Sequence, residues 1–402
     1  MKFLSDISHS IGSRLVLLVA TLGTVLLNSH FLGESGLGRV ALLQFGLLLV
    51  TGMAGFVAAG AVVFVRRSHK PSQLRKVAYL WCLLSAIVAS VLGAALGIIP
   101  SEWLIASSAL GLMQSIIVFH SQLLIAGGRI RTNNQLQIVQ TASLLASTLL
   151  TYLYFEIVTP MGFMWALSAA LAVALVFSII AMKGTWESAP TSGLHDTRSA
   201  TPLLFRYGSQ GSTGSILQLL TNRANLSLLN HFMGNASGAG VYSVVYYGVE
   251  AVWTIARALA PMVNTEVASA SSSVERRTIT AGYLKRTLML TIPLTILASV
   301  VPESFYAWVF GIKGIAIPLR ILSPGMIAGA ISSIIAHHLS AIGLHKWNAR
   351  TSGIGFTVLI CVGWFAVPTY GVAGAAVAAS AAYVSQAAGL IFALLKEDPK
   401  EN

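Results

Sequence analysis

The chain has 402 residues, of which 55% are hydrophobic and only 9% charged, and its mean hydropathy is +0.76. A soluble protein covers its surface with far more charge, so the composition excludes an ordinary soluble enzyme and predicts a surface that faces lipid. The formal net charge of +12 does not call for a nucleic-acid partner, because Lys and Arg accumulate in the cytoplasmic loops of membrane proteins.

Apolar segments long enough to cross a bilayer recur along the whole chain. A helix needs about 20 apolar residues to span the hydrocarbon core. The first segment carries no small-residue cleavage site, so we expect a retained helix, not a signal peptide. The pattern predicts an all-α integral membrane protein of about twelve transmembrane helices, at residues 11–32, 39–65, 77–99, 102–126, 134–156, 161–182, 203–231, 238–263, 284–310, 315–342, 351–367 and 371–395.

The connections between these spans alternate in charge. One set, which includes both ends of the chain, holds twenty of the 25 Lys and Arg residues. The other set holds only Arg39 and Lys313. Because basic loops stay in the cytoplasm, the split predicts a multi-pass protein of the bacterial inner (plasma) membrane with both termini cytoplasmic.

Three short motifs of the first half recur in the same order in the second half. HFLG at 30–33 returns as HFMG at 231–234, LIAGG at 124–128 as SAIG at 340–343, and TPMG at 159–162 as PTYG at 368–371. Each half has an even number of spans, so both enter the membrane in the same direction. We therefore expect two parallel six-helix repeats around a central cavity. The domains are an N-terminal bundle at 1–182, a cytoplasmic linker at 183–202 and a C-terminal bundle at 203–402.

Charged residues within the spans are candidates for function, since a charge at bilayer depth costs several kcal/mol without a polar cavity or a partner. The guanidinium groups of Arg223 and Arg257 are suited to phosphate oxygens, and Asn222 and Asn225 flank the first of them. Glu250 is expected either to pair with an arginine or to titrate and couple transport to an ion. Arg320 lies near a helix end, where its side chain can reach the membrane surface.

The segment at 205–263 carries a Gly/Ser-rich helix, an Asn-Arg pair, a short loop and then Gly240-x-Tyr242-Ser243. Together with HFLGESGLGRVALLQ at 30–44 and LSAIGLHKWNA at 339–349, it resembles the Wzx-type polysaccharide (O-antigen) flippases. These belong to the multidrug/oligosaccharidyl-lipid/polysaccharide (MOP) exporter superfamily. The resemblance implies a flippase that moves a polyprenyl-pyrophosphate-linked oligosaccharide across the inner membrane by alternating access, for polysaccharide biosynthesis. Its expected partners are membrane lipids, a polysaccharide polymerase and chain-length proteins.

Other functions stay open at this point. A multidrug/cation antiporter of the same superfamily should hold unpaired acids in its cavity, and a lipid II flippase is a nearer alternative. A polysaccharide polymerase or ligase needs a large external loop, and the predicted external loops are short. We expect a secondary transporter and not an enzyme, with no catalytic residue, no metal site and no cofactor, and with H+ or Na+ as the candidate coupling ion.

Overall fold

The computed structural model describes residues 2–188 and 199–396, and over these ranges it contains helices and no strand. The chain divides into two compact units, which we call unit 1 (Met1–Ile216) and unit 2 (Leu217–Asn402). The division falls inside the long helix α7 (Ala200–Met233). The predicted domains at 1–182 and 203–402 stay a prediction, and half of the predicted linker at 183–202, residues 189–198, lies outside the described residues.

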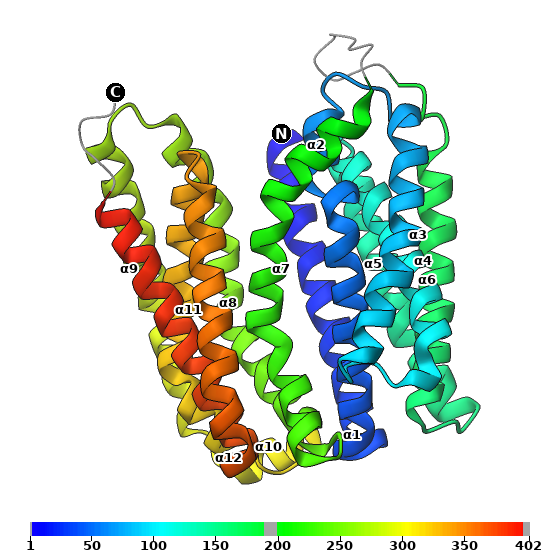
Figure 1. Ribbon diagram of the computed structural model, residues 1–402, viewed down its shortest axis with the longest axis vertical. Coiled ribbons are helices and arrows are strands. Elements are labelled where there is room, and N and C mark those ends of the chain that lie inside the picture. The colour runs from blue at the N-terminus through cyan, green and yellow to red at the C-terminus, as the bar shows by residue number, and fades with distance from the viewer. Residues whose placement is uncertain (1, 189–198, 397–402) are drawn as a thin grey trace. The chain divides into compact units, whose positions relative to one another are not determined.

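Unit 1 is a bundle around the long helix α1 (Figure 1). This helix packs against α3, α4 and α5. It is broken at Gly33, whose φ of 64° is accessible to glycine at little cost. The helices of the unit before α7 are α1 (Lys2–Ala58), α2 (Gly60–Val65), α3 (Pro71–Ala95), α4 (Leu104–Ala126), α5 (Ile130–Leu149) and α6 (Pro160–Met182).

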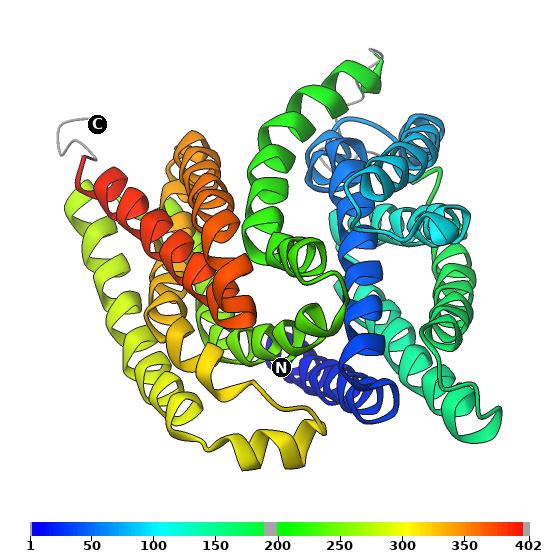
Figure 2. The same ribbon diagram turned by 60° about the horizontal axis from the view of Figure 1, so that its bottom comes forward.

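Unit 2 is organised around α11, which packs against α8, α9 and α12 (Figures 1 and 2). The last helix is broken at Gly371, where φ is 54°, as α1 is at Gly33. Besides the end of α7, the unit contains α8 (Ser237–Ser269), α9 (Ser273–Val300), α10 (Glu303–Phe310), α11 (Ala316–Ala341) and α12 (His345–Leu395).

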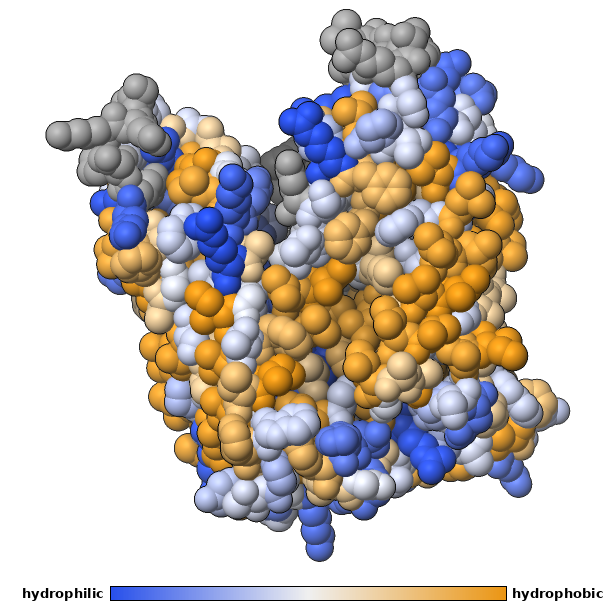
Figure 3. All heavy atoms as spheres, in the orientation of Figure 1, coloured by the Kyte–Doolittle hydropathy of each residue, from blue (hydrophilic) through white to orange (hydrophobic). Residues whose placement is uncertain are grey.

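The described residues contain eight helices that are long and apolar enough to cross a membrane. Two of these, α1 and α12, are broken by a glycine and long enough to cross twice. The more polar helices α7 and α8, of 34 and 33 residues, are also of spanning length. On the face shown in Figure 3, apolar side chains cover the middle of unit 1 and hydrophilic ones gather at its ends. The predicted all-α membrane fold of about twelve crossings is therefore confirmed.

The predicted span at 284–310 is wrong at both ends. Helix α9 already begins at Ser273 and ends at Val300, and residues 303–310 form the separate short helix α10. The break follows from Pro302, which has no backbone N–H and fits before the first turn of a new helix. The break also positions Glu303, whose carboxylate accepts the backbone N–H groups of Gly314, Ile315 and Ala316 at 2.6–3.2 Å. This acid therefore caps the start of α11, where the helix dipole favours a negative charge.

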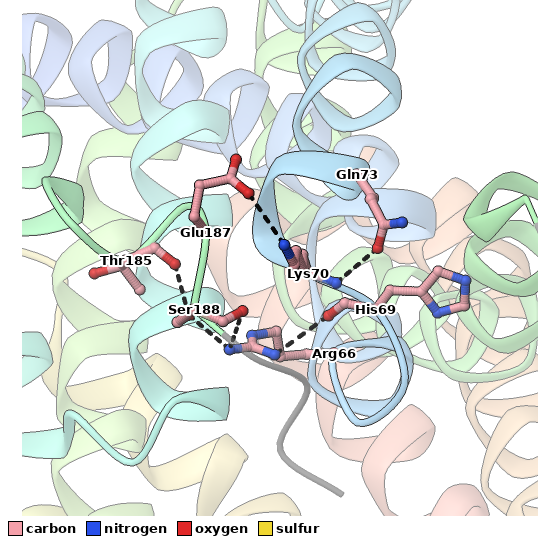
Figure 4. A network of polar contacts seen from close by, with 7 residues as sticks. All are labelled: Arg66, His69, Lys70, Gln73, Thr185, Glu187 and Ser188. Carbon is pink, nitrogen blue, oxygen red and sulfur yellow. Dashed lines mark hydrogen bonds and ion pairs between the residues drawn. The ribbon is translucent and has the colours of Figure 1, made fainter. Parts of the chain in front are cut away.

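The segment that follows α6 is attached to the turn between α2 and α3 within unit 1 (Figure 4). Arg66 is only 3% exposed, and its guanidinium donates to the hydroxyl of Ser188 at 2.8 Å and to the carbonyl of His69 at 3.2 Å. Lys70 and Glu187 form an exposed ion pair at 3.5 Å. The first residues of the predicted linker are thus bound to unit 1 by a buried guanidinium, which is worth more than the exposed ion pair.

Candidate functional site

Three charged side chains predicted to lie at bilayer depth meet within unit 2. Glu250, in the middle of α8, places one carboxylate oxygen 3.3 Å from the guanidinium of Arg223 on α7. Its other oxygen lies 3.4 Å from the guanidinium of Arg257, two turns further along α8. One carboxylate is therefore shared by two guanidinium groups, and the cluster of three residues carries one net positive charge.

The two arginines differ in their surroundings. The side chain of Arg223 is 14% exposed and that of Arg257 is 50% exposed, with Glu250 between them at 27%. The guanidinium carbon of Arg223 also lies 4.1 Å from the ring centroid of Tyr246, and the corresponding distance from Arg257 to Trp253 is 5.8 Å. Aromatic faces stabilise a cation that has lost part of its hydration. Arg223 is thus held firmly, whereas Arg257 has free surface for a ligand.

The two asparagines beside Arg223 have different positions. Asn225 is buried, and its amide donates to the hydroxyl of Tyr242 at 2.9 Å and to the carbonyl of Ala375 at 3.0 Å. It thereby joins α7 to α8 and α12. Asn222 is half-buried and accepts a hydrogen bond from Gln218 at 3.1 Å. Of the predicted binding residues, Asn222 and Arg257 line a cavity of unit 2. Asn225 instead holds three helices together through its hydrogen bonds.

This cavity of about 280 Å³ lies within unit 2, between α7, α8, α11 and α12. Polar side chains from all four helices reach it. Its lining residues are Gln218, Asn222, Trp253, Arg257, Gly329, Ser332, Ser333, Ala336, His337, Tyr383 and Gln386. Sequence reasoning predicted Arg257 from its charge at bilayer depth and Asn222 as a neighbour of Arg223. Gln218 lies four residues before Asn222 on the same face of α7, and this spacing was the signal available for it.

Two residues that line the cavity, Gln218 and Gln386, belong to a hydrogen-bonded group of neutral side chains. The side-chain oxygen of Gln218 accepts from the hydroxyl of Ser352 at 3.1 Å and from the amide of Gln386. Gln386 also donates to Ser352 at 3.2 Å. Hydrogen-bond partners are scarce in a lipid-embedded bundle. This group therefore fixes the position of α7 relative to the parts of α12 before and after the break at Gly371.

The other residues singled out in the sequence lie away from this cavity or contribute to packing. Arg320 is exposed and donates to the carbonyl of Ser299 at 2.9 Å, at the end of α9. Tyr242, from the motif Gly240-x-Tyr242-Ser243, is buried, and its hydroxyl accepts the hydrogen bond from Asn225. Among the described residues, no cluster of His, Cys, Asp or Glu has the geometry of a metal site.

Known proteins resemble this chain in structure but not detectably in sequence. No model of a known protein family matches it, and no curated protein matches it. Several solved structures, however, match this chain in fold. The lipid II flippase MurJ, in an inward closed conformation, superposes with a TM-score of 0.72 at 13% identity, over 97% of this chain and 88% of that chain.

Two multidrug transporters give similar values. An inward-facing MATE family transporter of the MOP superfamily superposes with a TM-score of 0.69 at 12% identity, over 96% of this chain and 99% of that chain. A mutant form of the Vibrio cholerae MATE transporter VcmN gives 0.67 at 15% identity, over 97% and 95% of the two chains. The chain has the fold of MATE transporters and MurJ. The superfamily expected from the sequence is thus found among the structural neighbours, while the Wzx-type specificity stays a prediction.

Proposed function

We propose that this protein is a flippase that moves a polyprenyl-pyrophosphate-linked oligosaccharide across a bacterial inner membrane by alternating access, as a step of polysaccharide or O-antigen biosynthesis. The observation that carries the proposal is the cluster of Arg223, Glu250 and Arg257. Two guanidinium groups against one carboxylate leave a positive charge on α7 and α8, two helices that are long enough to span a membrane. A pyrophosphate at the junction of lipid and sugar is an anion that guanidinium groups bind well.

The same cluster argues against the multidrug/cation antiporter. A binding site for organic cations needs an acid that is free to face its ligand. The acid in the middle of α8, Glu250, has both carboxylate oxygens occupied by arginine side chains. A like charge at Arg257 would repel a cation at the point where the cluster is most exposed. The likeness to MATE transporters therefore concerns the fold, and the charge distribution supports an anionic substrate.

A lipid II flippase is the second candidate, because the chain shares its fold with MurJ, which is a lipid II flippase. Lipid II is also a polyprenyl-pyrophosphate-linked sugar, so Arg223 and Arg257 fit it equally well. The two candidates differ in the sugar and not in the charged group. We expect membrane lipids to surround either substrate's prenyl chain, and we propose a polysaccharide polymerase and chain-length proteins as partners of the O-antigen route.

The experiment uses the purified chain in proteoliposomes. We expect it to move an undecaprenyl-pyrophosphate oligosaccharide with a fluorescent label on its sugar, detected by a membrane-impermeant quencher. The double variant Arg223→Gln/Arg257→Gln should lower the initial rate by at least about tenfold, since each charge-assisted contact is worth about 1.5–3 kcal/mol. Lipid II labelled in the same way separates the two candidates. Transport of ethidium with no movement of either lipid would overturn the proposal.

Coupling of transport to H+ or Na+ is proposed with Glu250 as the residue concerned. Neutralising this carboxylate would release both guanidinium groups at once, because each of its oxygens contacts one of them. The test is transport by Glu250→Gln under an imposed proton or sodium gradient. Gradient-dependent transport that stays at the wild-type rate in this variant would remove Glu250 from the coupling mechanism and leave it as an ion-pair partner.

A further inference from the structure

The cavity of unit 2 contains two buried hydroxyl groups that have no hydrogen-bond partner among the described residues. They are the phenol of Tyr383, on a side chain that is 1% exposed, and the hydroxyl of Ser332, which is 7% exposed. A buried polar group without a partner costs about 1–3 kcal/mol. Both residues line the same cavity, and both oxygens are covered in the structure, so one ligand can satisfy both if it displaces the side chains that cover them.

The amide groups of the cavity also have unused hydrogen-bonding capacity. Gln218 uses its oxygen for Ser352 and Gln386 and its amide nitrogen for Asn222. This leaves the amide nitrogen of Asn222 as a donor and the side-chain oxygen of Gln386 as an acceptor. The cavity wall thus offers both donors and acceptors at fixed positions.

His337 adds a further acceptor. Its Nδ1 lies 2.9 Å from the carbonyl oxygen of Ser333. A carbonyl can only accept, so Nδ1 carries the proton in the neutral ring, and Nε2 is left as an acceptor.

An aromatic side chain completes the cavity. The indole nitrogen of Trp253 donates to the carbonyl of Met326 at 2.8 Å, which fixes the ring. Gly329 lies so close to this ring that a Cβ added there would overlap it. The glycine therefore allows the indole to pack beside the cavity, which Trp253 lines together with the polar groups.

This combination of groups selects among ligand classes. A metal cation needs electron-pair donors alone, such as oxygen or nitrogen ligands, and a bare anion needs hydrogen-bond donors alone, but this cavity offers both donors and acceptors beside an indole. A sugar ring matches them, because each hydroxyl group both donates and accepts and its C–H face packs on an aromatic ring. The volume of 280 Å³ lies just below the range of about 300–1,000 Å³ typical of sites for drug-sized ligands. It is suited to one sugar ring and not to a whole oligosaccharide.

Arg257 links the cavity to the charged cluster, since it lines the former and pairs with Glu250 in the latter. We propose that the cavity binds the sugar residue joined directly to the pyrophosphate, with Arg257 at the phosphate end and Tyr383, Ser332, Asn222 and Gln386 on the sugar hydroxyls. This inference rests on the proposed function and adds to it. All polyprenyl-pyrophosphate-linked sugars share the lipid carrier and the pyrophosphate, and this cavity recognises the first sugar, which differs among them.

The test measures binding of soluble short-chain probes to the purified full-length protein in detergent by calorimetry. The probes are farnesyl pyrophosphate and farnesyl pyrophosphate linked to glucose, N-acetylglucosamine or N-acetylgalactosamine. We expect at least one sugar-bearing probe to bind about tenfold or more tightly than farnesyl pyrophosphate, as two or more added hydrogen bonds would give. Tyr383→Phe and Ser332→Ala should each lower the affinity for the sugar-bearing probe by about 5–10-fold. The affinity of each variant for farnesyl pyrophosphate should stay within about twofold of the wild-type value.

Thermal unfolding of the same variants provides the control. Tyr383→Phe and Ser332→Ala remove groups without an internal partner, so the unfolding temperature should stay the same or rise. Tyr152→Phe is the matched control in unit 1: its buried phenol donates to Asn28 at 2.8 Å, so this variant should lose stability and keep the preference for sugar.

The outcomes separate the two proposals. If farnesyl pyrophosphate binds but no sugar improves binding, or if Tyr383→Phe and Ser332→Ala leave the preference intact, the sugar site is overturned and the flippase stands. If no pyrophosphate probe binds at all, the proposed function itself fails.

Discussion

At the scale of single residues, the position of Glu250 between two arginines explains how a helix bundle of this hydrophobicity tolerates three charged side chains. Each oxygen of the carboxylate has a separate cation, and aromatic rings cover the more buried guanidinium at Arg223. Paired charges of this kind are expensive to separate, because removing one partner leaves the other desolvated. The exposure gradient from Arg223 to Arg257 then assigns them different parts: the first holds the cluster together, and the second is available to a ligand.

This gradient predicts unequal losses of stability. Arg223→Ala should lower the free energy of unfolding by about 2–3 kcal/mol, since it leaves one oxygen of the half-buried Glu250 carboxylate without its cation and removes the contact with the Tyr246 ring. Arg257→Ala should lower it by less than about 1 kcal/mol, because that pair is half exposed and screened. Thermal unfolding of the two variants in the same detergent checks the order. A larger loss for Arg257→Ala would show that Arg257, and not Arg223, anchors the cluster.

Single residues also show where sequence reasoning stopped. The cost of a charge in lipid singled out Arg223, Glu250 and Arg257, and the structure brings all three together. The same reasoning missed Tyr383 and Ser332, since neutral residues in apolar helices carry no signal of their own. Their unpartnered hydroxyls become visible only when the neighbouring helices are in place.

At the scale of helices, each unit repeats one polar contact between its third and fourth spans. In unit 1, His120 on α4 lies 2.7 Å from the hydroxyl of Tyr79 on α3. In unit 2, His338 on α11 lies 2.6 Å from the hydroxyl of Thr280 on α9. Both histidines are fully buried. A hydrogen bond between helices is a common means of fixing their register in lipid, so each unit fixes its third and fourth spans through a buried histidine.

A second feature at this scale is the close packing of α7 on α1 in unit 1. A Cβ added at Gly208 would overlap the backbone oxygen of Phe56, whereas one added at Gly211 would meet nothing within 4 Å. Small residues allow helix backbones to approach closely, and this contact accounts for glycine at 208.

The two glycines form a matched pair for mutation. Gly208→Ala should abolish accumulation of the folded protein or lower its free energy of unfolding by more than about 3 kcal/mol, because a backbone carbonyl cannot move aside cheaply. Gly211→Ala should be neutral or stabilising by up to about 1 kcal/mol through helix propensity. Fluorescence-detected gel filtration and thermal unfolding measure both effects. Equal behaviour of the two variants would contradict the close contact.

At the scale of the whole molecule, the charged connections predict the orientation in the membrane. Helix α11 is the clearest case, since Lys313 precedes it and Lys346 follows it, both exposed. The excess of basic residues on one set of loops predicts that Lys346 lies in the cytoplasm and Lys313 on the opposite side.

Labelling of single cysteines tests this orientation. In a background with Cys82 and Cys361 replaced by alanine, an impermeant maleimide should label Lys313→Cys in intact cells. It should label Lys346→Cys only after the membrane is permeabilised. Labelling of both positions in intact cells would show that the connections do not alternate as the charges predict.

The sequence by itself determined the all-α membrane fold, the approximate spans and the charged residues at depth. All three follow from the large free-energy cost of placing polar groups in lipid. This cost applies to each residue whatever its neighbours are. Tertiary structure decided the end of α9 at Val300, the use of Glu303 as a cap for α11, and the polar cavity beside Arg257. These depend on which side chains from distant helices come within hydrogen-bond reach, and that distance is set by packing and not by the order of residues.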